Sequence, residues 1–124
     1  MQVLIGLLSR QDFLYGVAII RGGLGGAYPL ITVKTRYYAY LREVTGLREE
    51  EIALEEGSTV ADLVEKLVKR YGEPLRRYIL TEDMELRPNI AVAVNGVKVS
   101  EEPLRKTLRE GDTVVILPPI SGGT

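Results

Sequence analysis

Residues 114–124 read Val-Val-Ile-Leu-Pro-Pro-Ile-Ser-Gly-Gly-Thr, and this run constrains the fold more than any other stretch of the chain. Its apolar, β-branched start predicts a strand buried on both faces, at the centre of a sheet. Pro118 and Pro119 remove two backbone donors and hold φ near the polyproline value. The hydrogen bonding of the sheet must therefore stop there, and the chain must leave the sheet in an extended form.

The residues after the two prolines predict a thin, projecting tail. Ile120 is followed by Ser121, Gly122 and Gly123, whose small side chains or lack of any would fit a narrow tunnel that excludes other residues. Small residues near a C-terminus are more often a frayed end. A buried central strand that leads directly into Pro-Pro and Gly-Gly is an unusual way to build a frayed end, so we favour insertion of the tail into a partner protein.

Composition excludes several classes of function. The 124 residues are enough for one domain, and a net charge of -1 gives no excess that would favour nucleic acid or an anionic membrane. The chain contains no histidine and no cysteine, so it lacks the usual general base near neutral pH, a thiolate nucleophile and the commonest metal ligands. We expect no metal site, no bound cofactor and no catalysis by this chain alone.

Residues 1–31 differ from the rest, and we interpret them as an N-terminal extension. Their apolar runs are too short to reach the ~20 residues that span a bilayer. The glycines at 22–26 fit neither the dinucleotide-binding nor the P-loop pattern. Two interpretations stay open: a poorly ordered or artefactual extension, or extra strands and an oligomer contact formed by the apolar runs at 4–8 and 17–20. We favour poor order or peripheral packing.

The first half of the remaining chain predicts two strands and a long helix. Apolar and polar residues alternate from 32 to 38, as in a half-buried strand, and residues 50–54 predict an antiparallel partner after a helical turn that ends at Gly46. Thr59 and Asp62 form a capping-box pattern at the start of the main helix. Apolar residues then recur at helical spacing as far as Gly72, and we expect this stripe to cover one sheet face.

The second half predicts a linker followed by three strands. Residues 73–88, which contain Pro74, are expected to be a linking region. Residues 90–94 predict a strand with Ala91 and Ala93 outward, on a flat face open to a partner. Asn95-Gly96 is a strong hairpin signal that joins it to a short strand at 97–99. A short helical turn at 103–108 leads into the final strand.

Two groups of like charge need an interpretation. We interpret the acidic group as a solvated edge of the sheet and not as paired catalytic carboxylates; it comprises Glu49, Glu50, Glu51, Glu55 and Glu56. The basic group is either a solvated helix end or a surface for an acidic partner, and it comprises Lys69, Arg70, Arg76 and Arg77.

The order of predicted elements is strand, strand, helix, strand, short strand, strand. With a right-handed crossover, the first and last strands become adjacent and parallel at the centre of the sheet, and the helix crosses one face. The sequence therefore predicts an α+β fold of the β-grasp (ubiquitin-like) type, with residues 32–124 as the domain and a projecting Gly-Gly tail.

Five motifs of this domain are specific when taken together: Tyr-Ala-Tyr-Leu-Arg-Glu at 38–43, Gly-Ser-Thr-Val-Ala-Asp-Leu at 57–63, Val-Asn-Gly at 94–96, Gly-Asp-Thr-Val at 111–114 and Pro-Pro-Ile-Ser-Gly-Gly at 118–123. Together they resemble the small subunit of molybdopterin synthase (MoaD), a ubiquitin-like sulfur carrier related to ThiS and to the archaeal SAMP modifiers. The resemblance extends over residues 32–123.

The resemblance implies a carrier in molybdenum cofactor biosynthesis and not an enzyme. A MoeB-like adenylating enzyme would use ATP to activate the carboxylate of Gly123, and sulfur would then displace AMP to leave a thiocarboxylate. The tail would enter a MoaE-like large subunit, which supplies the catalytic groups, in the cytoplasm. We expect the partner contacts to be made by Leu117, Pro118, Pro119, Ile120, Ser121 and Gly122.

The sequence departs from this family at Thr124, which follows the Gly-Gly pair. We expect Thr124 to be removed before Gly123 can be activated. Two alternatives stay open: a protein modifier or tRNA-thiolation carrier like the SAMP group, which precursor processing would suit, and a plain β-grasp interaction domain with an inert tail.

Overall fold

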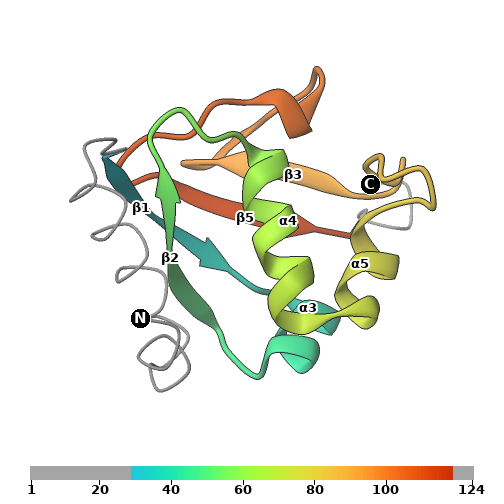
Figure 1. Cartoon of the computed structure of the whole chain (residues 1–124). Helices are drawn as coiled ribbons and strands as arrows, with labels where there is room; N and C mark the ends of the chain where they lie inside the picture. Colours follow the sequence, from blue (N-terminus) through green and yellow to red (C-terminus); the bar gives the residue numbers. More distant parts are fainter. Residues whose placement is uncertain (1–28, 119–124) are drawn as a thin grey trace, which may run out of the picture.

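β1 (Leu30–Arg36) and β5 (Thr113–Leu117) lie side by side at the middle of a five-stranded sheet in the computed structural model of the chain, which describes residues 29–118 (Figure 1). The other strands are β2 (Glu49–Glu55), β3 (Ala91–Val94) and β4 (Val97–Lys98), and the order is β2-β1-β5-β3-β4. β1 and β5 are parallel, and every other pairing is antiparallel. The predicted β-grasp sheet is confirmed.

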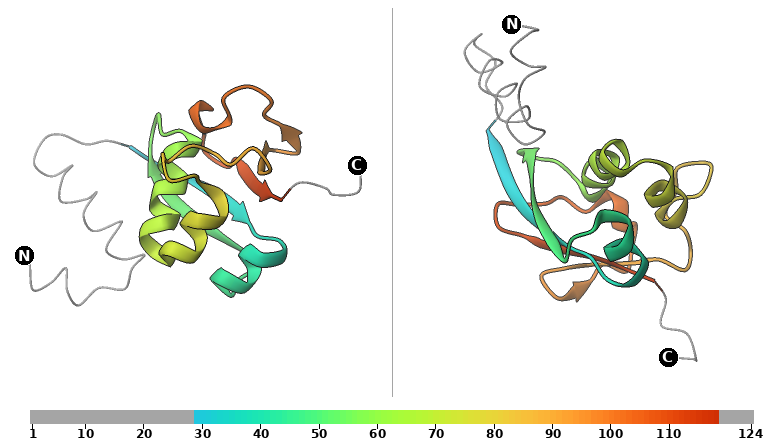
Figure 2. Two further views of the ribbon diagram at one scale, coloured as in Figure 1. Left: turned by 90° about the vertical axis from the view of Figure 1, so that its right-hand side faces the viewer. Right: turned by 90° about the horizontal axis from the view of Figure 1, so that it is seen from below.

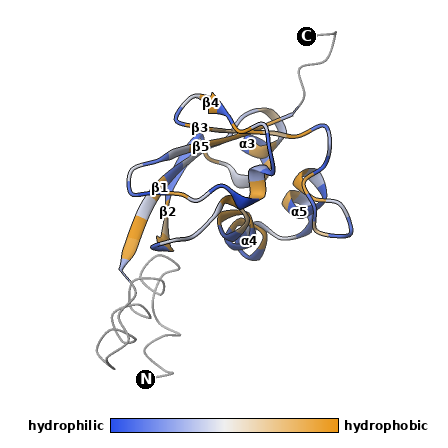
Figure 3. Ribbon diagram, turned by 90° about the horizontal axis from the view of Figure 1, so that it is seen from above, coloured by the Kyte–Doolittle hydropathy of each residue, from blue (hydrophilic) through white to orange (hydrophobic). Residues whose placement is uncertain are grey.

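Burial alternates along the central strands because only one face of the sheet is covered. Val114 and Ile116 are fully buried, whereas Val115 and Leu117 are half-buried. The prediction that this strand is buried on both faces is therefore wrong. Helices α4 (Val60–Tyr71) and α5 (Glu73–Ile79) lie on the same side of the sheet, which leaves the other face open among the described residues (Figure 3). Ala91 and Ala93 lie half-buried on that open face, as predicted.

The main helix, α4 (Val60–Tyr71), begins at the predicted capping box. The backbone N–H of Thr59 donates to Asp62 Oδ2 at 2.8 Å, and the backbone N–H of Asp62 donates to Thr59 Oγ1 at 3.4 Å. The helix buries Val60, Leu63, Val64 and Leu67 against the sheet, and Gly72 ends it. Burial of this stripe is what fixes the helix on the sheet, since isolated helices of this length are marginal in water.

Residues 73–79 form a second helix, α5 (Glu73–Ile79), where the sequence analysis predicted part of a linker. Pro74 is compatible with a helix because it lies in the first turn, where the backbone N–H has no intrahelical acceptor. Leu75 and Ile79, four residues apart, are fully buried and attach α5 to the core. The linker prediction is wrong for this segment.

Three smaller elements complete the described chain. α3 (Ala39–Thr45) buries Leu41 and ends at Gly46, whose φ of 76° is the left-handed C-terminal conformation. Asn95 and Gly96 both have positive φ, 53° and 82°, as the predicted hairpin turn requires. η1 (Pro103–Arg105) is one 3-10 turn. Within residues 29–118 no helix is long and apolar enough to cross a bilayer.

Candidate functional site

The root of the predicted tail is the end of β5, where Leu117 and Pro118 are both half-buried. Leu117 is paired with Ala91 of β3, whereas the pairing with β1 ends two residues earlier, at Arg36 and Val115. Pro118 has no N–H with which to continue either ladder. The chain thus leaves the centre of the sheet at Pro118, as the sequence predicts. Five predicted contact or sulfur-carrying residues, Pro119, Ile120, Ser121, Gly122 and Gly123, lie outside the described residues together with Thr124.

The end of β5 lies at the same end of the molecule as α3, and the two views of Figure 2 agree on this. The loop that joins β1, the neighbour of β5, to α3 is short, because only Tyr37 and Tyr38 separate the two elements. α3 in turn contacts α5, so a partner that binds the root of the tail would approach these two helices.

One tyrosine from α3 and one from α5 meet at the surface of the molecule. The ring centroids of Tyr40 and Tyr78 are 4.9 Å apart, and Tyr40 is 42% exposed. Together with Pro74 and Arg77 they line a shallow groove of about 360 Å³. Exposed aromatic rings with an arginine are typical of the energetically important part of a protein interface. The sequence analysis did not single out this groove; the signal was the excess of tyrosine over phenylalanine, seven to one.

A second aromatic contact lies between β1 and α3. The guanidinium carbons of Arg36 and Arg42 are each 5.8 Å from the ring centroid of Tyr38, within the range of a cation–π interaction. Ala39, the residue after Tyr38, has a φ of 51°, which an alanine rarely adopts. Backbone strain is thus present at the turn between β1 and α3.

Glu50 does not belong to a solvated edge, and the prediction is wrong for this residue. Its Oε2 accepts hydrogen bonds from Tyr37 Oη at 2.5 Å and Tyr71 Oη at 2.6 Å, and its Oε1 pairs with Arg70 Nη1 at 2.7 Å. The Glu50 side chain is only 13% exposed. For the other four acidic residues, which are all exposed, the prediction is confirmed; they are Glu49, Glu51, Glu55 and Glu56.

Both tyrosines of this network are held in the protonated form. Burial, followed by the hydrogen bond to Glu50 and the negative charge of Glu50, raises the pKa of Tyr71 to about 12. The same causes in the same order raise the pKa of Tyr37 further. The network therefore joins β2 and α4 to Tyr37, the residue that follows β1.

Three residues of the predicted basic group form ion pairs with acidic side chains of the same chain. Arg70 pairs with Glu50, and Arg76 Nε lies 2.9 Å from Glu73 Oε2. Lys69 Nζ is 3.7 Å from Glu65 Oε2 on the exposed face of α4. Arg77 remains exposed, and it lines the tyrosine groove. The solvated-helix-end interpretation holds for Lys69, and the group does not form one basic surface.

The part of the chain that the structure describes contains no group of three acidic side chains that could hold a metal ion. The arrangement at this end of the molecule is thus a rigid sheet, a chain that leaves it at a proline, and an aromatic surface beside the exit. These features suit recognition of a partner and presentation of a peptide end.

Comparison with known proteins decides the family. The ThiS family matches residues 35–123, which includes nearly the whole described domain and continues through the Gly-Gly pair. The chain belongs to the ThiS family. This is a family of ubiquitin-like sulfur carriers, and the resemblance to the MoaD, ThiS and SAMP group is confirmed.

Two curated relatives match this chain over almost their full lengths. Small archaeal modifier protein 3 of Haloferax volcanii is 32% identical over 92 residues, which is 73% of this chain and 98% of that protein. A molybdopterin synthase sulfur carrier subunit of Drosophila yakuba is 30% identical over 95 residues, which is 77% of this chain and 94% of that protein. Both are named as carriers or modifiers, consistent with a small ThiS-family protein that is not itself an enzyme.

Solved structures share the β-grasp fold. Small archaeal modifier protein 1 of Haloferax volcanii superposes with a TM-score of 0.64 and 29% identity, covering 74% of this chain and 99% of its own. CysO of Amycolatopsis orientalis, solved in a complex with BexX, gives a TM-score of 0.59 at 29% identity, covering 73% and 99%. A ThiS-like fold is thus known in complex with a second protein.

Proposed function

We propose that this ThiS-family chain is the sulfur-carrier small subunit of molybdopterin synthase, with sulfur carried on the carbonyl carbon of Gly123. The observation that carries the proposal is the family match, which runs through Gly123 and stops before Thr124. The exit of the chain from the sheet at Pro118 supports it, because Gly123 is five residues farther along the chain and a five-residue segment can span at most about 16 Å. The Drosophila yakuba relative, a molybdopterin synthase sulfur carrier subunit, favours this function.

The chemistry needs two steps at Gly123. A carboxylate oxygen attacks the α-phosphorus of ATP and pyrophosphate leaves, which gives an acyl adenylate. Hydrosulfide, or an equivalent sulfur nucleophile from a partner, then adds to the carbonyl carbon, and AMP leaves with its bonding electron pair. The product is a thiocarboxylate. Glycine suits both steps because it has no Cβ to hinder attack on its carbonyl carbon.

Thr124 follows Gly123, so the carboxylate of Gly123 exists only after the Gly123–Thr124 peptide bond is hydrolysed. We propose that a protease or an isopeptidase-like enzyme makes this cut. Mass spectrometry of the protein purified from its own host tests the step, and Thr124 present on every molecule would contradict it.

The catalytic groups are proposed to lie on two partners. A MoeB-like adenylating enzyme would bind the ATP, and a MoaE-like large subunit would accept the tail and transfer the sulfur to a pterin precursor. Absence of histidine and cysteine from this chain agrees with such a division. Because adenylation draws on the ATP of the cell interior, we propose a cytoplasmic location. Contacts with both partners would use Leu117 to Gly122 and the tyrosine groove beside the root of the tail.

A protein modifier is the second candidate, and the 32% identity to small archaeal modifier protein 3 favours it. In that function the activated Gly123 would form an amide with a lysine, or would supply sulfur to tRNA. Purification from the host separates the two candidates. A stable complex with a large synthase subunit supports the first, and conjugates on cellular proteins support the second.

The decisive experiment uses protein that ends at Gly123, its cognate adenylating enzyme, ATP and sulfide. We expect the mass of the carrier to rise by the exchange of one oxygen for one sulfur. A Gly123→Val variant is the matched control, and it should load far more slowly. If the Gly123-terminated protein forms no AMP adduct and gains no sulfur, the tail is inert and the carrier proposal fails.

A further inference from the structure

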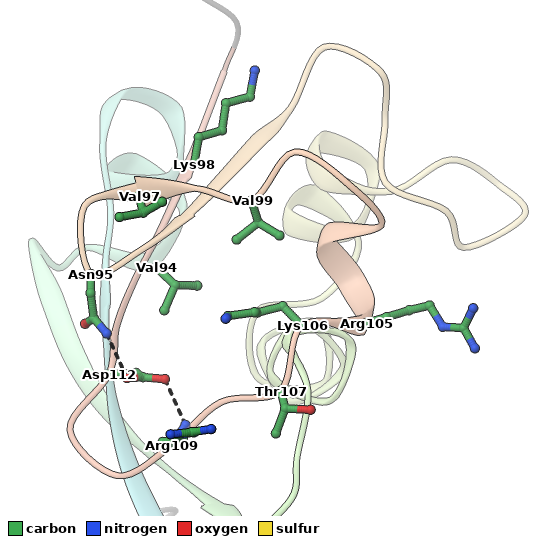
Figure 4. A pocket seen from close by; sticks show the side chains of 10 residues that line it. All are labelled: Val94, Asn95, Val97, Lys98, Val99, Arg105, Lys106, Thr107, Arg109 and Asp112. Carbon is green, nitrogen blue, oxygen red and sulfur yellow. Dashed lines mark hydrogen bonds between the residues drawn. The ribbon is translucent and has the colours of Figure 1, made fainter.

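A groove of about 980 Å³ opens between the β3–β4 hairpin and the loop that follows η1 (Figure 4). Four of its ten lining residues are cationic, three are valines and one is acidic. The groove lies near the start of β5, because Val94 pairs with Val114, whereas Ala91 pairs with Leu117 at the root of the tail. Three residues of extended strand, about 10 Å, separate the two places.

Two of the cations that line the groove, Lys106 and Arg109, have no ion-pair partner within residues 29–118. Figure 4 shows Lys106 reaching from the loop toward the hairpin, with Arg109 beside Asp112. Neither side chain forms a hydrogen bond or ion pair within residues 29–118. Arg105, by contrast, points away and pairs with Glu102 at 2.9 Å. The lining thus combines two cations that form no ion pair within the described residues with one carboxylate, Asp112.

The fold separates these cations from the acidic residues near them in the sequence. Glu110 faces β1 instead, where its Oε1 accepts a hydrogen bond from the backbone N–H of Thr32 at 2.9 Å. Asp112 is the acidic residue of the groove, and both of its oxygens are used. Oδ1 accepts from Asn95 Nδ2 at 2.8 Å, and Oδ2 accepts from the backbone N–H of Arg109 at 2.8 Å. An incoming carboxylate would therefore meet Lys106 and Arg109 without displacing an internal ion pair.

The other side of the groove is apolar. Val97 is 68% exposed, and Val94 and Val99 also line the groove. Among the described residues no aromatic ring lines the groove, so a nucleotide base would find nothing there on which to stack. An extended peptide places alternate side chains on opposite sides, so aliphatic side chains would contact the valines while carboxylates contact the cations.

From this charge complementarity and the apolar wall, we infer that the groove binds an extended, acidic and aliphatic segment of a partner protein. The site is distinct from the tail, and the distance along β5 allows both to be occupied at once. It does not depend on the proposed sulfur chemistry, since none of the lining residues belongs to the tail or to the surface beside it.

The test is fluorescence anisotropy with the full chain and a labelled peptide of alternating glutamate and valine. A peptide of the same length with glutamine for glutamate is the charge control. We expect the glutamate peptide to bind at least about tenfold more tightly, with an affinity that falls as salt is added. Inorganic phosphate and single-stranded polyuridine, added as competitors, should not displace it at equal concentration.

A double variant, Lys106→Glu with Arg109→Glu, should lose at least about tenfold in affinity for the glutamate peptide. Its matched control is Arg48→Glu with Lys69→Glu, which changes the net charge equally at exposed positions outside the groove. A lysine–valine peptide should gain affinity for the groove variant, and this gain cannot come from misfolding. Equal binding of the glutamate and glutamine peptides, equal loss in both double variants, or displacement by phosphate or polyuridine would overturn the proposal.

Discussion

Tyr71 at the end of α4 donates a hydrogen bond of 2.6 Å to Glu50 on β2, and so joins the main helix to an edge strand of the sheet. The same carboxylate accepts from Tyr37 and pairs with Arg70, so one acidic group serves three partners from two other segments. Networks of this kind stabilise a fold only when every member is satisfied. Removing the Glu50 carboxylate should therefore lower the free energy of unfolding more than removing an exposed carboxylate beside it.

Glu50→Ala is expected to lower the free energy of unfolding by about 3 kcal/mol, because it leaves Arg70 with a largely buried and unpaired charge. The exposed neighbour Glu51 is the control, and Glu51→Ala should change stability by less than about 0.5 kcal/mol. Urea denaturation of the two variants measures both values. Equal effects would mean that Glu50 is as solvated as the rest of the acidic edge.

The network also predicts a loss of stability in alkali. The pKa of Tyr71 is 10.0 in an unfolded chain and about 12 in the folded one, so the protonated hydroxyl contributes all of its stability below pH 10. That contribution disappears as the pH rises from 10 to about 12, where the unfolded chain binds fewer protons than the folded one. Tyr71→Phe should flatten this part of the stability–pH curve. Urea denaturation at a series of alkaline pH values compares the variant with the original protein, and identical slopes would contradict the assignment.

Thr35 carries a buried hydroxyl that has no hydrogen-bond partner among the described residues. Replacing it with the isosteric valine removes the cost of desolvating that hydroxyl, and Thr35→Val should raise the free energy of unfolding by about 1 to 2 kcal/mol. Thr32→Val, on the half-exposed face of the same strand, controls for the higher strand propensity of valine. Chemical denaturation should give the larger gain at position 35.

Ala39 offers a second position where the original residue is not the most stable choice. At a φ of 51° a Cβ is strained, so Ala39→Gly should stabilise the protein by about 0.5 to 1 kcal/mol. Ala61 is exposed within α4, where φ is negative, and Ala61→Gly should destabilise by about 1 kcal/mol. The midpoint temperature of thermal unfolding should therefore rise for Ala39→Gly and fall for Ala61→Gly. A loss at both positions would show that the strain at Ala39 is not relieved by glycine.

The sheet was predictable from sequence because its information is local. The alternation of Val33, Thr35 and Tyr37 with polar residues predicts β1, and Asn95-Gly96 predicts the hairpin because both residues tolerate positive φ. The environment of Glu50 was not predictable in this way, because its partner Tyr71 is 21 residues away and only the packing of α4 on the sheet brings them together. Lys106 and Arg109, the groove cations without an ion pair in the described residues, were unpredictable for the same reason, since Glu110 is next to Arg109 in the sequence but accepts a hydrogen bond from Thr32 instead.

Helix α5 shows a different failure. The predicted linking region at 73–88 is wrong over α5, because the first turn of a helix accepts Pro74, and the spacing of Leu75 and Ile79 was the available signal. The tail itself was predicted from residue types alone. Pro118 is where the described chain leaves β5, and the function of residues 119–124 rests on the chemistry proposed for Gly123.

Two isoleucines four residues apart should separate the scaffold from the tail. Ile116 is fully buried at the centre of the sheet, so Ile116→Ala should lower the free energy of unfolding by about 1 to 4 kcal/mol.

Ile120 follows the two prolines, and Ile120→Asp should leave the free energy of unfolding unchanged within about 0.5 kcal/mol. It should instead weaken binding to a large synthase subunit or to the adenylating enzyme, because it forces a charge into a contact that excludes water. Urea denaturation and titration calorimetry with either partner measure the two quantities separately. If Ile120→Asp unfolds the domain while Ile116→Ala spares it, the division between a rigid sheet and a presented tail is wrong, since stability would then reside in the segment proposed to be handed to another protein.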